Sequence, residues 1–169
     1  IDGEAANDRS GSSVCMPSKN TKAIGAYSND GNGIDAGHVR VYDWNGSAWI
    51  QRGSDIDGEA LGDESGFSVD MPDSNTLAIG ARRNDASGVD AGHVRIYTWN
   101  GSTWIQKGSD IDGEAAGDYS GGAISLSGNG QMIAIGARFN DGGGSNAGHV
   151  RVYKYSGSSW TQMGNDLDG

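Results

Sequence analysis

One unit of 55 residues repeats along the chain. The tetrapeptide Ile-Asp-Gly-Glu begins at positions 1, 56 and 111, and the last residues, Leu167-Asp-Gly, begin the same motif again. The third unit is one residue longer, and the additional residue precedes Gly136. Repeats of this length are typical of propellers, solenoids and arrays, in which one unit cannot bury its hydrophobic surface alone. We therefore divide the chain into the blade repeats 1–55, 56–110 and 111–169, the last including the start of a further linker.

Each repeat contains four segments with the composition of β-strands, and no segment has a helical period. In the first two repeats Asn-Gly separates the third segment from the fourth, which predicts a tight hairpin with both turn residues at positive φ. Tyr155-Ser-Gly replaces Asn-Gly in the third repeat. The expected strands are Ser12–Met16, Thr21–Ala26, Gly37–Trp44 and Ala48–Arg52; Phe67–Met71, Thr76–Ala81, Gly92–Trp99 and Thr103–Lys107; and Gly122–Leu126, Gln131–Ala137, Gly148–Tyr155 and Ser159–Met163.

The third strand of each repeat indicates how the sheets pack. In the first repeat Val39 and Val41 alternate with large polar and aromatic residues, so one face is aliphatic and neither face is typical of a solvated surface. Sheets stacked face to face would bury both sides. We expect the aliphatic positions of all three repeats to be buried: Val39, Val41, Val94, Ile96, Val150 and Val152.

These patterns predict an all-β fold of three four-stranded antiparallel propeller-type blades. Closed propellers have about four to eight blades. The chain starts without Met and ends within its own linker motif. We therefore expect the blades to belong to a larger propeller, ring or repeat array, formed either with adjoining repeats of a longer chain or with further copies of this one.

The repeat resembles the FG-GAP repeat, the blade of the integrin α-subunit propeller. The family's Phe-Gly corresponds to Ser10-Gly11, its Gly-Ala-Pro to Gly25-Ala26-Tyr27, and its Ala-Gly-x-Val-x-Val-aromatic pattern to Ala36-Gly-His-Val-Arg-Val-Tyr42, with counterparts in both other repeats. The Phe and the Pro are missing in every repeat. The resemblance implies a propeller blade of an extracellular or cell-surface protein. The family's Ca²⁺ loop corresponds to Pro17-Ser-Lys-Asn20, which lacks acids, so that site is not transferred here.

Charge and composition exclude several classes of function. The net charge is −10, which argues against nucleic-acid binding because that requires a basic surface. No apolar run approaches the roughly 20 residues of a membrane-spanning helix, so we expect no membrane insertion. The single cysteine, Cys15, aligns with Asp70 and Ser125, which predicts an outward position.

Acidic residues concentrate in the linkers between repeats. Within each inner linker four acids occupy relative positions 1, 3, 5 and 9, and Ca²⁺ prefers several carboxylate and carbonyl oxygens on a turning backbone. One interpretation is a Ca²⁺ loop at each junction, and the alternative is a solvated acidic connector whose acids cap backbone N–H groups. The candidate metal ligands are Asp55, Asp57, Glu59 and Asp63, and Asp110, Asp112, Glu114 and Asp118.

A second loop, Asn29–Asp35, recurs at 84–90 and 140–146 and is interpreted as a Gly/Asn turn rather than a metal site. The only histidines, His38, His93 and His149, occupy one position in every repeat. We interpret them as packing residues, with a metal ring at an assembly axis as the alternative.

Aromatic residues flank the hairpin of every repeat. They are expected to stabilise the hairpins as cross-strand pairs, and the alternative is a sugar-stacking surface between blades. Asn45 and Asn100 begin N-glycosylation sequons that overlap the hairpin turns. The candidate ligand-binding residues are Trp44, Trp49, Trp99, Trp104 and Trp160.

No catalytic motif is present: the sequence has no Gly-x-Ser-x-Gly, no phosphate loop and no zinc-type Cys/His cluster. We expect a non-enzymatic, extracellular structural or adhesive module. The alternatives are a lectin-like glycan-binding propeller and a propeller appended to a secreted hydrolase.

Overall fold

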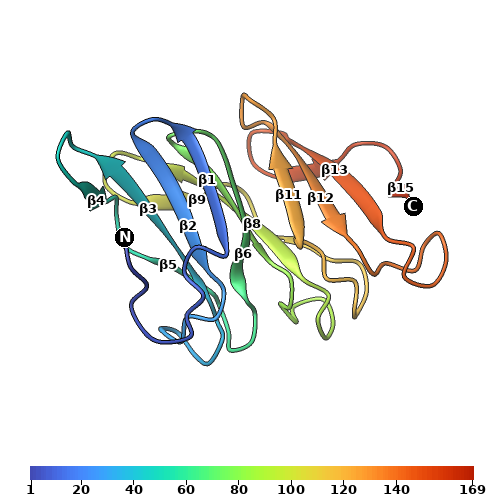
Figure 1. Cartoon of the computed structure of the whole chain (residues 1–169). Coiled ribbons are helices and arrows are strands. Elements are labelled where there is room, and N and C mark those ends of the chain that lie inside the picture. Colours follow the sequence, from blue (N-terminus) through green and yellow to red (C-terminus); the bar gives the residue numbers. More distant parts are fainter.

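The computed structural model describes residues 1–169, and all of its regular structure is β (Figure 1). Three antiparallel sheets follow one another along the chain, each with four strands and a two-residue fifth strand. No helix capable of crossing a membrane is present. The strands are β1 (Ser13–Ser18), β2 (Thr21–Ala26), β3 (His38–Trp44), β4 (Trp49–Gln51) and β5 (Ile56–Asp57); β6 (Ser65–Asp73), β7 (Thr76–Ala81), β8 (His93–Trp99), β9 (Trp104–Gln106) and β10 (Ile111–Asp112); and β11 (Ala123–Leu126), β12 (Met132–Ala137), β13 (His149–Tyr155), β14 (Trp160–Gln162) and β15 (Leu167–Asp168).

Within each sheet the four main strands lie in sequence order, so the predicted fold class is confirmed: the sheets are arranged as propeller-like blades. The short fifth strand was not predicted, because two residues carry no periodic pattern. It pairs with the beginning of the third strand, as in the register Val39↔Ile56. The acidic linker therefore starts as an extended segment bonded to the sheet it leaves, and only afterwards crosses to the next sheet.

Neighbouring sheets pack face to face through two hydrophobic cores. In the first core, Val39 and Val41 of β3 meet Leu77 and Ile79 of β7, and all four are essentially inaccessible to solvent. The second core repeats this arrangement between the second and third sheets, with Val94 and Ile96 on one side. Burying each such side chain stabilises the fold by about 1.5–3 kcal/mol. The stacking of sheets, rather than any single sheet, therefore supplies the core.

The predicted burial of the aliphatic positions is confirmed in the first two repeats and wrong in the third. Val150 is 37% exposed, and Val152 is only half-buried. The reason is that no sheet of this chain covers that face of β13. The same residue pattern is thus buried or exposed according to whether a neighbouring blade is present.

The hairpins form at the predicted places but with a different turn. Trp44 pairs with Trp49, which leaves four residues in the loop, and only Gly46 of the Asn-Gly pair has positive φ. The Asn45 side-chain oxygen accepts hydrogen bonds from the backbone N–H groups of Ser47 and Ala48, each at 2.9 Å. Asn45 therefore closes the loop through its side chain and not through a left-handed backbone.

Backbone groups of adjacent blades also contact one another directly. The Ser13 hydroxyl donates to the Gly66 carbonyl at 2.6 Å, and Ser68 donates in the same way to Gly121 at 2.7 Å. The Gly66 carbonyl oxygen lies against Gly25, and the Gly121 carbonyl oxygen lies against Gly80. A Cβ at either glycine would overlap the carbonyl oxygen of the next blade. Ala123 stands at the third equivalent position and has no hydroxyl to donate.

Cys15 faces the second sheet, and the predicted outward position is wrong. It packs against the first hydrophobic core, and its counterpart Asp70 accepts a hydrogen bond from the Leu126 backbone N–H at 2.6 Å. The polar Asp70 therefore serves a contact between blades. Burial raises the pKa of the Cys15 thiol to about 12.

We expect Cys15 to react with iodoacetamide at pH 8 at least about 100-fold more slowly in the folded protein than in the unfolded chain, because the thiolate is the nucleophile. Timed alkylation followed by mass spectrometry measures both rates. The guanidinium-unfolded chain is the control. Equal rates in the two states would contradict the buried, protonated thiol.

Candidate functional site

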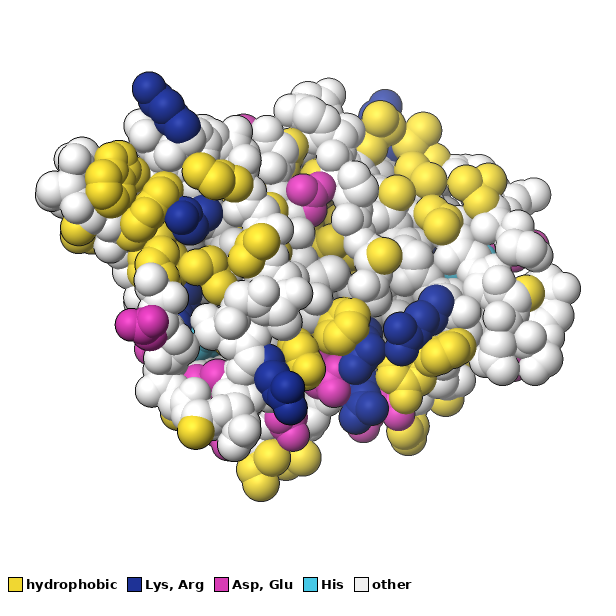
Figure 2. All heavy atoms as spheres, viewed as in Figure 1, with side chains coloured by type: hydrophobic (Ala, Val, Ile, Leu, Met, Phe, Trp, Pro, Cys, Tyr) yellow, Lys and Arg dark blue, Asp and Glu magenta, His cyan; other side chains and the backbone are white.

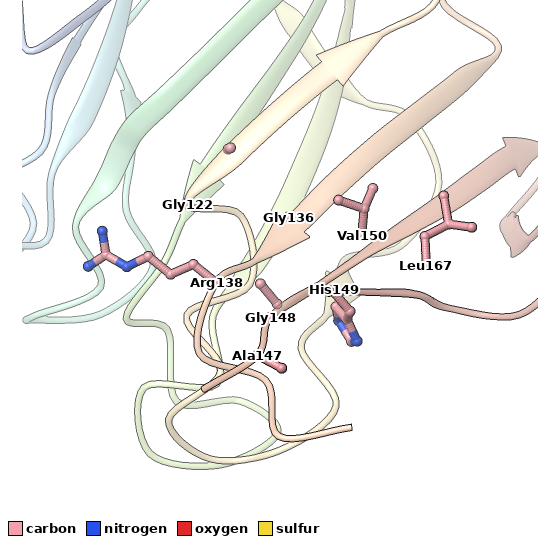
Figure 3. A pocket seen from close by; sticks show the side chains of 11 residues that line it. Gly122, Gly136, Arg138, Ala147, Gly148, His149, Val150 and Leu167 are labelled. Carbon is pink, nitrogen blue, oxygen red and sulfur yellow. The ribbon is translucent and has the colours of Figure 1, made fainter. Parts of the chain in front are cut away.

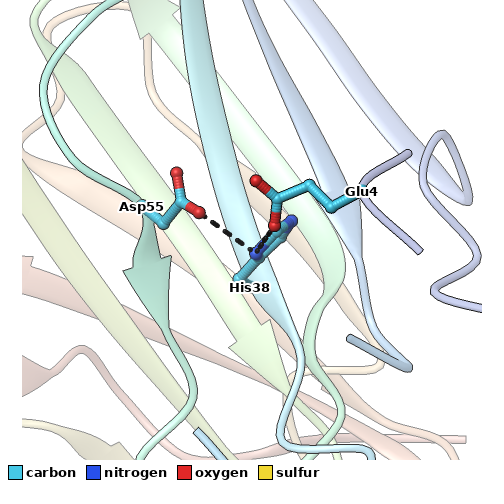
Figure 4. A group of neighbouring side chains, drawn as sticks. All are labelled: Glu4, His38 and Asp55. Atoms are coloured by element: carbon cyan, nitrogen blue, oxygen red, sulfur yellow. Dashed lines mark ion pairs between the residues drawn. The ribbon is translucent and has the colours of Figure 1, made fainter. Parts of the chain in front are cut away.

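A histidine lies between two carboxylates at the same place in every repeat. In the first repeat His38, the first residue of β3, faces Glu4 from the segment before β1 and Asp55 from the segment before β5 (Figure 4). In each cluster the three donor atoms lie within 4.8 Å of one another. The three Glu–His–Asp clusters are Glu4, His38 and Asp55; Glu59, His93 and Asp110; and Glu114, His149 and Asp166.

Each cluster lies where a linker reaches a sheet. Glu59 follows β5, which pairs with the first sheet, whereas His93 opens β8 in the second sheet. The third cluster joins the second linker to the third sheet in the same way, through Glu114 and His149. Two of the clusters therefore connect consecutive blades.

The second cluster brings three carboxylates to a fully buried histidine. The His93 side chain is 1% exposed, and its Nδ1 lies 3.8 Å from Glu59 Oε2 and 4.0 Å from Asp110 Oδ2. A third carboxylate oxygen, from Asp112, is also 4.0 Å from Nδ1. Neither ring nitrogen of His93 has a hydrogen-bond partner, and the same is true of His149. Buried polar atoms are nearly always hydrogen-bonded, so these nitrogens require an explanation.

The electrostatics of this cluster keep the histidine neutral. Burial, together with the nearby Arg95 guanidinium, lowers the pKa of His93 to about 4. Burial, reinforced by Asp110, raises the pKa values of Glu59 and Asp112. Arg95 Nη1 lies 3.5 Å from Glu59 Oε1, and its Nη2 donates to the Asp57 carbonyl at 2.8 Å. A neutral imidazole thus faces carboxylate oxygens. The Glu59 carboxylate contacts Arg95 through its other oxygen.

The predicted linker acids do not converge into one loop site. Asp55 belongs to the cluster of His38, whereas Glu59 belongs to that of His93. The Asp63 Oδ2 atom accepts hydrogen bonds from the Ala60 backbone N–H and from Asn84 Nδ2, each at 3.0 Å. The physical reason is β5, whose extended backbone separates the acids instead of wrapping them around an ion. The second linker divides Asp110, Asp112, Glu114 and Asp118 in the same manner.

The second loop has the hydrogen bonds of a turn. Asn29 Oδ1 accepts from the Gly31 backbone N–H, while Asn29 Nδ2 donates to the buried Asp8 carboxylate. Asp30 Oδ1 accepts from the backbone N–H of Asp35, which has a φ of 51°. Side chains that satisfy backbone groups and a left-handed residue account for the sequence of this loop.

The tryptophans pack within and between the blades. Trp44 and Trp49 pair across the hairpin with ring centroids 5.4 Å apart. Trp104 Nε1 donates to the Arg52 carbonyl of the preceding repeat at 3.0 Å, and Trp160 donates to that of Lys107 at 2.7 Å. Trp99 and Trp104 form the equivalent pair, with ring centroids 5.4 Å apart and ring planes tilted by 56°. Asn45 and Asn100 lie in exposed turns.

The Glu–His–Asp clusters were not found by sequence reasoning, which assigned the histidines to packing and the acids to separate loops. The pattern that could have found them is the common register: every repeat places Glu, His and Asp at fixed positions. No known protein-family model matches the chain, and no curated protein matches its sequence.

Proposed function

We propose that this chain is a non-enzymatic, extracellular structural or adhesive module built of FG-GAP-like blades. Its end faces bind further blades of the same kind, supplied by adjoining repeats of a longer chain or by another copy. One observation carries this proposal. The third sheet presents on its open face the surface that the first two sheets bury against a neighbour.

Equivalent positions of the three sheets differ in their exposure to solvent. Val39 and Val94 have no exposed surface, whereas Val150 is 37% exposed. Leu167 is 61% exposed, although its counterparts Ile56 and Ile111 are buried. Together with Gly136 and Ala123, Val150 and Leu167 border a hollow of about 530 Å³ (Figure 3). Gly25 and Gly80 each have a carbonyl oxygen of the next blade against them. The equivalent space beside Gly136 is open.

The opposite end presents the complementary kind of face. Val14, Met16, Ile24 and Trp49 border a hollow of about 440 Å³ on the first sheet. Hydrophobic side chains gather over both end sheets, β1–β4 and β11–β13 (Figure 2). This face differs from the buried faces at one position, where Lys22 replaces the apolar Leu77 and Ile133 of the other sheets. The Lys22 ammonium lies 3.5 Å from the Trp49 ring centroid. A blade that covers this face must leave the Lys22 ammonium in water or pair it.

The proposal contains no catalytic step, because the three Glu–His–Asp clusters have the same composition and nearly the same distances. A set of equivalent sites supports structure or binding. Trp104 and Trp160, two of the tryptophans that suggested glycan binding, donate hydrogen bonds to the preceding blade. Trp44 and Trp49 pair across their own hairpin. These contacts favour a packing role over glycan binding.

We expect the chain to self-associate at micromolar concentration, and Gly136→Ala to weaken this association at least about tenfold. The added methyl group would occupy the space needed by a docking carbonyl, while it contacts only Ala123 within its own chain. Sedimentation velocity over a concentration series measures the association. Gly128→Ala, at an exposed glycine with open space around it, is the matched control.

A second measurement covers the case in which the next blade comes from the same polypeptide. Leu167-Asp-Gly169 already stands for residues 56–58, so appending a copy of residues 59–113 after residue 169 should raise the melting temperature by covering the third sheet. A chain that remains monomeric and gains no stability from the added blade would contradict the proposal.

A further inference from the structure

The ring nitrogens of His93 and His149 are buried without a hydrogen-bond partner. Both side chains are about 1% exposed, and each Nδ1 points toward carboxylate oxygens without forming a hydrogen bond. A buried nitrogen left without a hydrogen-bond partner destabilises the folded state. A repeated arrangement of this kind favours a ligand that satisfies the nitrogen and the carboxylates together.

The distances fit a small cation. Across the three clusters, Nδ1 lies 3.5–4.0 Å from the Glu and Asp oxygens. Ligand atoms about 2.0–2.2 Å from a tetrahedral ion lie about 3.3–3.6 Å from each other. The separations between Nδ1 and the carboxylate oxygens exceed this range by at most a few tenths of an ångström, and all three donor atoms of each cluster lie within 4.8 Å of one another.

The donor atoms select the class of cation. Ca²⁺ and Mg²⁺ prefer sites built only from oxygen, whereas one imidazole nitrogen with two carboxylates suits Zn²⁺ and related transition-metal ions. Arg95 holds Oε1 of Glu59 and leaves Oε2 facing the histidine. Arginine thus orients the ligand from outside, as groups behind metal ligands commonly do.

We propose that each Glu–His–Asp cluster binds one divalent transition-metal cation, with Zn²⁺ as the representative ion. In the second cluster the ligands are Glu59, His93 and Asp110, with Asp112 available as an additional carboxylate. Because Glu59 belongs to the linker leaving the first sheet and His93 to the second sheet, the ion ties neighbouring blades together. This proposal stands independently of the end-to-end assembly described above.

Titration of the metal-free chain, residues 1–169, with Zn²⁺ in a calorimeter tests the proposal. We expect three equivalents to bind, and His93→Gln to reduce this number to two. Co²⁺ provides a second readout, because visible absorption reports its coordination by nitrogen and oxygen. Asp35→Asn is the matched control: it removes a carboxylate outside the clusters, at a left-handed position that Asn tolerates.

Three results would overturn the proposal: no binding of Zn²⁺, three equivalents retained by His93→Gln, or a stabilisation by Ca²⁺ that does not depend on His93. The last result would instead favour an all-oxygen site made by linker acids. If His93→Gln does not fold, as judged by circular dichroism, Asp110→Asn replaces it. The Asp110 side chain is 31% exposed, and the same loss of one equivalent is expected.

Discussion

Leu77→Ala should lower the free energy of unfolding by about 2–5 kcal/mol, the usual range for a leucine truncated in a well-packed core. Leu77 has no exposed surface and lies between the first and second sheets, against Val39 and Val41. The cavity would form between β7 and β3, so the substitution would weaken the packing of the first blade on the second. Chemical denaturation followed by tryptophan fluorescence measures the change.

The repeat supplies a matched control at the same structural position. Lys22 is the counterpart of Leu77 in the first sheet, and its ammonium lies over Trp49 at the surface. Lys22→Ala should cost less than about 1 kcal/mol, the value of an exposed cation–aromatic contact. Equal losses for the two variants would show that the stacking of sheets is not the main source of stability.

The blade architecture could be predicted because two patterns agreed. The 55-residue period defined the unit, and the alternation along Val39 and Val41 required a second sheet on that face. Burial of each copy could not be predicted in this way. Val94 and Val150 stand in nearly identical sequences, and only the presence of a neighbouring blade distinguishes them.

The Glu–His–Asp clusters were harder to predict because their members are distant in sequence. Glu59 and His93 are brought together only when the linker crosses between sheets, so spacing within the linker was misleading. Asp55 and Glu59 were expected to share a loop, but the extended strand β5 lies between them. Asp55 therefore belongs to the cluster of His38 and Glu59 to that of His93. A repeated histidine also resembles a packing residue when only its own strand is considered.

Gly80→Ala should destabilise the chain by about 3 kcal/mol or more, at the upper end of the effects of overpacking. A Cβ at Gly80 would overlap the Gly121 carbonyl of the next blade. It would also displace the Ser68 hydroxyl, which donates to that carbonyl at 2.7 Å. Because the obstacle is backbone, the two sheets must separate, and the second hydrophobic core between them loses its close packing.

The same substitution at the third repeat should have little effect on the isolated chain. A Cβ at Gly136 would meet only Ala123, at 3.6–3.7 Å, which is ordinary van der Waals contact. Thermal unfolding of Gly80→Ala and Gly136→Ala, both measured below the concentration at which the chain associates, compares one change in two settings. Similar melting temperatures for both variants would mean that the carbonyl over Gly80 does not set the distance between blades. A large difference would show that these glycines are required by the neighbouring sheet rather than by the strand that contains them.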